Sequence, residues 1–357
     1  MTNIKSPNSE TFQLAKKLLL DGDLVAFPTE TVYGLGANAL DTKAVSKIFQ
    51  LKNRPSDNPL IVHVGYKKDI SKYGIISNPI EKKIIEKLMP GPITILLRKR
   101  ENIPDIVSSN PFVGIRIPSN QVALKLLKTC DLAIAAPSAN ISTKPSPTSA
   151  QMVYEYFGNK LDLIIDGGDC NVGIESTVVK VDEYSQCLPM TDGDCKISYN
   201  IIIMRPGFVS KEDLQDLFMD NKNVSVEYST QLSNISPGNL HRHYSPNAKV
   251  EIINDLTQEI FKEKFDTKIS GSPHIKLGLI LTQEFINSHQ KILNQYKDYI
   301  HVFPRGSRND LITCAQKIFN IYNLCDKLNI NYILIEGLPE IGLGYSIMNR
   351  IKKSAEK

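Results

Sequence analysis

The first two-thirds of the sequence alternates short apolar runs, rich in β-branched residues, with segments of helical period. Residues 24–27 and 60–64 are typical of strands, and residues 42–51 between them have the spacing of an amphipathic helix. The pattern continues through a helix at 80–88, strands at 93–97 and 113–117, a helix at 121–127, and strands near 163–165, 177–181 and 201–204. This alternation predicts an α/β domain with a twisted sheet.

A second, smaller α/β unit is predicted after residue 248. Strands are expected near 250–253, 277–281, 301–303 and 332–335, with helices at 310–327 and 343–353, in a roughly Rossmann-like pattern. Between the two units, residues 211–247 are predicted to contain a short helix, followed by a polar segment with little hydrophobic periodicity. The chain of 357 residues is therefore predicted to have domains at 1–210 and 248–357, joined by a linker at 211–247.

Charge argues against a nucleic-acid arm and against a membrane protein. The 42 Lys and Arg residues nearly balance 38 Asp and Glu residues, and neither half of the chain is strongly basic. No apolar run approaches the ~18 residues of a membrane helix, and the first ten residues are too polar for a signal peptide. We therefore expect a cytoplasmic protein with no membrane contact.

Several familiar sites are missing. The six cysteines form no C-x-x-C pair, and the single H-x-H, at His241 and His243, has no further ligand at metal-binding spacing, so no metal site of the protein's own is expected. The chain also lacks a P-loop, a complete dinucleotide-binding glycine motif and a G-x-S-x-G elbow.

Hydroxyl groups and glycines follow the first predicted strand, in residues 27–36 (FPTETVYGLG). Ligands of α/β sheets commonly bind at such strand ends. The alternative is a tight turn in which Gly34 and Gly36 take positive φ.

Two cations on a proline-rich segment are candidates for a triphosphate site. Arg54 offers a planar fork and Lys52 a point charge, although both could simply complement a helix end. His63, inside an apolar strand, would by default be a hydrogen-bonded core histidine. Arg116, also among apolar strand residues, needs a partner, and without further context an internal Asp or Glu is slightly favoured over a ligand carboxylate.

Two further polar loops come at strand ends, at residues 135–148 and 173–177. Four such loops, together with Lys52, Arg54 and Arg116, favour one shared pocket for an anionic ligand over four separate capped turns.

These segments together resemble the Sua5/YrdC/YciO family in its long, Sua5-type form, over nearly the whole chain. The resemblance rests on PTETVYGLG, the K-x-R pair with NPLIVH, the IRIP strand, S-x-N with KPSPT, GIESTVV, the RPG at 205–207, the linker SPG…HRHYSP and the tail GLG…NR. It implies a YrdC-like twisted-sheet domain with a large open cavity and a C-terminal Sua5 domain.

The resemblance also implies a reaction. The protein would be a nucleotidyltransferase that makes L-threonylcarbamoyladenylate and pyrophosphate from L-threonine, bicarbonate or CO2, and ATP with Mg2+, for t6A at position 37 of tRNA. Threonine's amine would attack CO2, and the new carboxylate would attack the α-phosphorus of ATP. Transient contact with the transferase machinery or tRNA would follow.

Site residues are carried over position by position from the family pattern. Lys52 and Arg54 would be the catalytic pair. Threonine would meet Thr31, His63, Arg116, Ala136 and Ser176. ATP would meet Lys52, Arg54, Asn58, Ser138, Asn140, Ser146 and Arg205, with Phe112 contributing through its backbone and His243 and Tyr244 of the linker folding over it.

Two alternatives come from other classes. A non-catalytic RNA-binding module would need a basic face, which the balanced charge does not favour. A carbamoyl-transfer domain of the hydrogenase-maturation kind would bring an acylphosphatase-like region and zinc-finger cysteines, and the sequence has neither.

Overall fold

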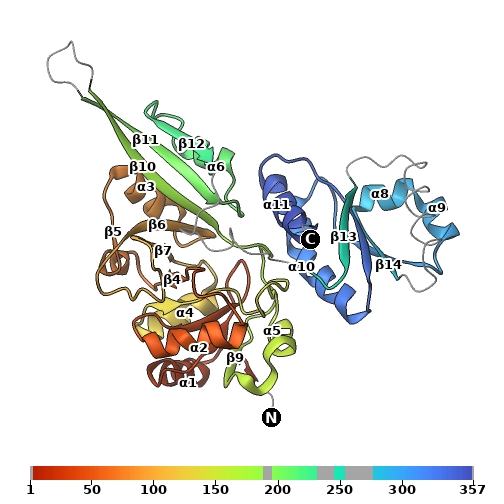
Figure 1. Ribbon diagram of the computed structural model, residues 1–357, viewed down its shortest axis with the longest axis horizontal. Helices are drawn as coiled ribbons and strands as arrows, with labels where there is room; N and C mark the ends of the chain where they lie inside the picture. Colours follow the sequence, from red (N-terminus) through yellow and green to blue (C-terminus); the bar gives the residue numbers. More distant parts are fainter. Residues whose placement is uncertain (1–2, 188–194, 231–244, 254–275, 356–357) are drawn as a thin grey trace.

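The computed structural model describes residues 3–187, 195–230, 245–253 and 276–355, which form two α/β units lying side by side (Figure 1). The mixed α/β class predicted from the alternating pattern is confirmed. Helices α10 (Leu311–Lys327) and α11 (Leu343–Ala355) of the second unit face the first unit.

The first unit is built on a twelve-stranded mixed sheet. Its strand order is β1-β9-β2-β3-β8-β4-β7-β6-β10-β11-β12, with β5 paired to β6. The strands are β1 (Ile4–Lys5), β2 (Val25–Phe27), β3 (Gly34–Asn38), β4 (Ile61–His63), β5 (Gly74–Ile75), β6 (Ile93–Lys99), β7 (Phe112–Arg116), β8 (Ile134–Ala135), β9 (Leu163–Ile165), β10 (Thr177–Cys187), β11 (Cys195–Arg205) and β12 (Val224–Tyr228).

Helices cover both faces of this sheet. Because successive strand residues point to opposite faces, Val25 and Phe27 of β2 pack with α1 and α4, whereas Ala26 packs in the cluster that includes α2 and α3. The helices are α1 (Ser9–Leu20), α2 (Thr42–Lys52), α3 (Pro79–Leu88), α4 (Gln121–Cys130), α5 (Ala150–Phe157) and α6 (Lys211–Leu217), with short 3-10 turns η1 (Lys67–Lys72) and η2 (Gly158–Lys160).

Gly36 of the 27–36 segment is needed for close packing, and the alternative of a tight turn with positive φ at Gly34 and Gly36 is wrong. Gly34 and Gly36 belong to strand β3, and neither has a positive φ. A Cβ on Gly36 would come within 2.7 Å of Ile134 and 2.8 Å of Phe27. Glycine at position 36 therefore leaves room against β3 for the side chains of Phe27 and Ile134, which come from the neighbouring strands β2 and β8.

The first unit extends beyond the predicted boundary at residue 210. Strand β12 pairs with β11, and α6, capped by Ser210, packs Leu214 into the first core. Because α6 and β12 are short, their hydrophobic periodicity in the sequence is weak. Their position in the fold is fixed by the pairing of β12 with β11. Residues 211–228 thus belong to the first unit and not to a linker, and residues 224–228 add a strand to its sheet.

The second unit is a four-stranded parallel sheet in the order β13-β16-β14-β15. Strands β14 and β16 are buried along their whole length, as expected where helices cover both faces. The strands are β13 (Lys249–Ile253), β14 (Leu277–Leu281), β15 (Ile300–Pro304) and β16 (Tyr332–Glu336), and α8 (Gln283–Ser288) and α9 (Gln290–Gln295) join α10 and α11 as its helices.

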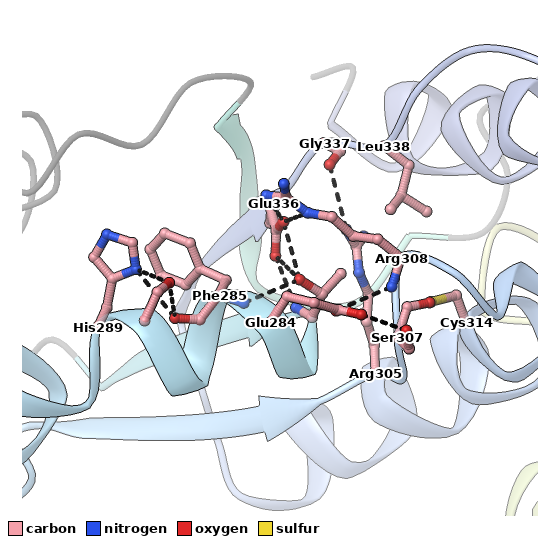
Figure 2. A network of polar contacts seen from close by, with 12 residues as sticks. Glu284, Phe285, His289, Arg305, Ser307, Arg308, Cys314, Glu336, Gly337 and Leu338 are labelled. Atoms are coloured by element: carbon pink, nitrogen blue, oxygen red, sulfur yellow. Dashed lines mark hydrogen bonds and ion pairs between the residues drawn. The ribbon is translucent and has the colours of Figure 1, made fainter.

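A polar network closes the carboxyl end of this second sheet (Figure 2). Glu336, at the end of β16, accepts hydrogen bonds from the Thr282 backbone N–H (2.7 Å) and from Arg308 Nε (2.7 Å). Glu284 in turn accepts from the backbone N–H of Arg308 (3.0 Å) and from the Ser307 hydroxyl. These groups satisfy one another and tie the ends of β14, β15 and β16 together.

None of the helices in the described ranges is long and apolar enough to cross a membrane.

Candidate active site

Loops from at least five strands of the first sheet surround one cavity that polar and apolar groups line together; its empty space, counting the part open to solvent, is about 670 Å³. Strand β4, in the middle of the sheet, has only three residues, so groups at both of its ends reach the same cavity. The lining comprises Thr29, Thr31, Val32, Tyr33, Gly34, Arg54, Pro59, Ile61, His63, Arg116, Ala136, Pro137, Ser138, Asn140, Lys144, Ser146, Glu175, Ser176 and Arg205.

The electrostatics of this cavity favour an anion. Within the described part of the chain, its lining contains four permanently cationic side chains, from Arg54, Arg116, Lys144 and Arg205, against one carboxylate, from Glu175. Low-dielectric walls concentrate the field of such charges. The four polar loops predict a pocket for an anionic ligand, and this cavity, with more cationic than anionic side chains in its described lining, is where such a ligand would bind.

The structure brings most of the predicted site residues together, although their individual roles stay predictions. Those that line the cavity are Thr31, Arg54, His63, Arg116, Ala136, Ser138, Asn140, Ser146, Ser176 and Arg205.

Lys52, predicted to contact the triphosphate directly, lies behind the cavity wall. Its side chain is buried, and Nζ donates to the carbonyl oxygens of Ser138 (2.6 Å) and Asn140 (2.5 Å). Burial, and then the nearby charge of Arg54, lowers the pKa of this ammonium group well below its usual value. Lys52 is therefore placed to hold the Ser138–Asn140 loop in position.

Two other predicted ATP contacts also lie outside the lining, and two cannot be placed. Asn58 is buried, and its carbonyl oxygen accepts from Arg54 Nε (3.3 Å). The Phe112 ring lies under the Lys180 ammonium, 5.0 Å from it, and the Phe112 carbonyl accepts from Ser108 (2.6 Å). His243 and Tyr244 fall outside the described residues.

Arg116 has the internal carboxylate partner that its sequence position slightly favoured. Its Nη2 pairs with Glu30 Oε1 at 2.7 Å, and both side chains are buried. The other Glu30 oxygen accepts from the backbone N–H of Ser119 (3.1 Å). Arg116 Nε is buried with no hydrogen-bond partner among the described residues, and Glu30 fixes the orientation of the guanidinium.

His63 faces the cavity as a neutral imidazole. Burial, and secondarily the charge of Arg116, lowers the pKa of His63 to about 3. It pairs in register with Arg116 across β4 and β7, and Phe27 packs edge-on against its ring. The histidine thus offers a polar but uncharged surface beside the guanidinium.

The low pKa of His63 predicts a pH-dependent loss of stability. The unfolded chain takes up a proton near pH 6.5, the folded chain only near pH 3. Above pH 6.5 the neutral imidazole costs the folded state nothing. Below pH 6.5 the free energy of unfolding falls by about 1.4 kcal/mol per pH unit because of His63. Urea unfolding between pH 7.5 and 4.5 should show wild type losing stability relative to His63→Gln; parallel curves would contradict the assignment.

Several lining residues were missed by sequence reasoning. Thr29, Tyr33, Lys144 and Glu175 each lie within one to two residues of a predicted site residue or inside a quoted motif. A carboxylate is an unexpected neighbour for phosphates, so the residue type of Glu175 gives no local signal for a place in this site. Its partner, Arg350, comes from the other domain, and no local pattern indicates that contact.

No group of three or more His, Cys, Asp or Glu side chains suited to a metal ion occurs in the described ranges.

Two family models together cover most of the chain. The model described as "Telomere recombination" matches residues 17–188, and the "Threonylcarbamoyl-AMP synthase, C-terminal domain" model matches residues 209–356. The first match ends before β11 of the first sheet, and the second takes in α6 and β12 of the first unit together with the whole described part of the second unit.

Individual relatives match along the full length. Threonylcarbamoyl-AMP synthase of Pyrococcus abyssi is 34% identical, over 96% of this chain and 93% of the relative, and that of Bacillus subtilis is 34% identical, over 99% and 96%. The crystal structure of P. abyssi Sua5 complexed with L-threonine superposes with a TM-score of 0.82 at 31% identity, covering 99% of this chain and 97% of that one.

Fold, cavity and matches together define a two-domain protein with a YrdC-like domain carrying the cavity and a Sua5 domain beside it. The chain belongs to the threonylcarbamoyl-AMP synthase family, in its long Sua5-type form.

Proposed function

We propose that this protein is an L-threonylcarbamoyladenylate synthase, a nucleotidyltransferase that converts L-threonine, CO2 or bicarbonate, and ATP to L-threonylcarbamoyl-AMP and pyrophosphate. The observation that carries the proposal is a single cavity in which a buried, pre-oriented guanidinium and several further cations line the same space as hydroxyl and amide groups. Full-length similarity to threonylcarbamoyl-AMP synthases supports it.

Threonine would bind at the Arg116 end. Its carboxylate would pair with the guanidinium, which Glu30 already holds in one orientation. Thr31 and Ser176 would offer hydroxyl groups and Ala136 a small apolar contact. Because His63 is neutral, it would accommodate the amine without repelling it.

ATP would occupy the adjoining part of the cavity, because Arg205 donates to Ser176 of the threonine end (Nη2 to Oγ, 3.1 Å). Arg54 and Arg205 would pair with phosphate oxygens, and Ser138, Asn140 and Ser146 would donate or accept hydrogen bonds. Lys52 would support this wall from behind. Mg2+ would enter with ATP on its phosphate oxygens, where it would offset further negative charge.

The proposed reaction needs no nucleophile from the protein. The threonine amine attacks CO2, forming a C–N bond and releasing a proton, which gives N-carboxythreonine. An oxygen of the new carboxylate then attacks the α-phosphorus, and pyrophosphate leaves. The cavity would accelerate both steps by holding the reactants together and by stabilising charge on the departing pyrophosphate.

The product would then supply the transferase that modifies tRNA at position 37 to t6A. We propose the cytoplasm as the compartment and transient contact with that transferase or tRNA as the route of transfer.

Omission assays test the proposal. Pyrophosphate release and chromatographic detection of the adenylate are measured with Mg-ATP, L-threonine and bicarbonate, and with each left out in turn. Both products should require all three substrates. Release of pyrophosphate without threonine, or salt-sensitive tRNA binding with no turnover of ATP, would refute the synthase assignment.

A further inference from the structure

A guanidinium of the second domain reaches the wall of the first domain's cavity. Arg350, on α11, is fully buried, and its Nε pairs with Glu175 Oε2 at 2.8 Å. Its Nη2 donates to the carbonyl oxygen of Pro206 (2.7 Å), one residue after the lining residue Arg205. On the same helix, the Ser346 hydroxyl donates to the Gly207 carbonyl oxygen (2.7 Å).

Glu175 connects this contact to the cavity. It lines the cavity itself, and its second oxygen, Oε1, accepts from the hydroxyl of Ser146 at 2.6 Å. Arg350, Glu175 and Ser146 thus form a continuous chain of hydrogen bonds from α11 to a residue assigned to ATP.

The interface around this chain is closely packed. A Cβ on Gly173, two residues before Glu175, would lie 2.3 Å from Cα of Gln316 on α10. Val172 and Ile174 belong to the same buried apolar cluster as residues of α10 and α11. The side chain of Arg350 has no exposed surface and that of Glu175 only 7%, so solvent screens the interaction between their charges little.

An unpaired carboxylate at this position would oppose the proposed function. Glu175 is the carboxylate that faces the space assigned to the triphosphate, and like charges brought together in a buried site repel strongly.

We propose that Arg350 of the C-terminal domain is a positioning residue for the ATP site: it neutralises Glu175 and fixes Ser146, so that the triphosphate binds in the first domain only while the second domain is docked. This inference rests on the proposed function and assigns the second domain a direct part in it.

The protonation of Glu175 gives the inference a characteristic signature. Burial raises the pKa of Glu175, but Arg350, Arg205 and the hydrogen bond from Ser146 outweigh that effect and hold the pKa below its usual value. Without Arg350, the pKa of this carboxyl should rise. Lowering the pH would then protonate Glu175 in the variant and remove the repulsion, whereas Glu175 of wild type would stay ionised.

The test is the affinity for Mg-ATP of Arg350→Met, by calorimetry and as the KM in pyrophosphate release. We expect the dissociation constant and KM for ATP to rise by about 10-fold or more, with a much smaller change in the threonine KM. The difference in ATP affinity between the variant and wild type should narrow as the pH is lowered. The double variant Glu175→Gln/Arg350→Met should recover most of the affinity.

Lys352→Met is the matched control, because Lys352 lies on the same helix and its exposed ammonium pairs only with Glu340 among the described residues. It should bind ATP as wild type does.

An Arg350→Met variant with an unchanged ATP affinity would overturn the inference, and so would a defect of equal size for threonine at every pH. If Arg350→Met fails to fold, the double variant Glu175→Gln/Arg350→Met replaces it, because that protein buries no unpaired charge. ATP binding by the double variant that is more than 10-fold weaker than in wild type would overturn the inference. Binding of ATP is measured independently of turnover, so a wild-type protein that binds ATP but releases no pyrophosphate would refute the proposed function alone.

Discussion

Replacing Arg54 with alanine is expected to lower pyrophosphate release by roughly 100-fold, because a preorganised cation beside the leaving pyrophosphate acts mainly in the transition state. Arg54 lines the cavity and is oriented by the carbonyl oxygens of Asn58 (3.3 Å) and Pro59 (3.0 Å). The kcat and KM for ATP would be measured at saturating threonine and bicarbonate, with thermal unfolding as the check on folding.

Arg98→Ala provides a matched control for Arg54, since Arg98 is an exposed arginine on β6 outside the cavity lining. It should retain full turnover. A folded Arg54→Ala protein with near-normal kcat and KM would show that the phosphates are held elsewhere.

Replacing Arg116 is expected to weaken the binding of threonine much more than the binding of ATP. A charge-assisted pair contributes about 1.5–3 kcal/mol, so the threonine KM should rise by about 10- to 100-fold, with a much smaller change in the ATP KM. Because Arg116→Met alone would leave Glu30 buried and unpaired, a loss of about 3–5 kcal/mol, the substitution is best made together with Glu30→Gln.

The single variant Glu30→Gln is the reference for this experiment, since it retains Arg116 in the cavity. A double variant whose threonine KM equals that of Glu30→Gln would show that the threonine carboxylate does not bind Arg116. Equal increases in the KM values for both substrates would instead indicate general disruption of the cavity.

The elements and the approximate contents of the site could be predicted from local sequence. The spacing of apolar residues predicts β4 and α2, and hydroxyl groups next to strand ends indicate the loops that hold Thr31, Ser138 and Ser176. The choice of these individual residues comes from the family resemblance. These signals lie within a few residues of one another, so they are visible without a three-dimensional structure.

The role of individual charges could not be predicted in this way. Arg116 among apolar residues requires a partner, but nothing local shows that Glu30, 86 residues away, provides it. Lys52 and Arg54 look equivalent in sequence, yet only Arg54 lines the cavity, because the Lys52 ammonium is taken up by the carbonyl oxygens of Ser138 and Asn140.

The sequence by itself determined the α/β class, the two-domain organisation and the polar loops that line the cavity, because hydrophobic period and turn chemistry are local properties. Only the tertiary structure decided that residues 211–228 complete the first sheet, that Lys52 lies behind the wall, and that Arg350 pairs with Glu175 across the domain interface. The physical reason is that strand pairing, burial and charge neutralisation depend on partners from distant parts of the chain. Local sequence does not show which residues provide the hydrogen bonds and opposite charges that each group needs.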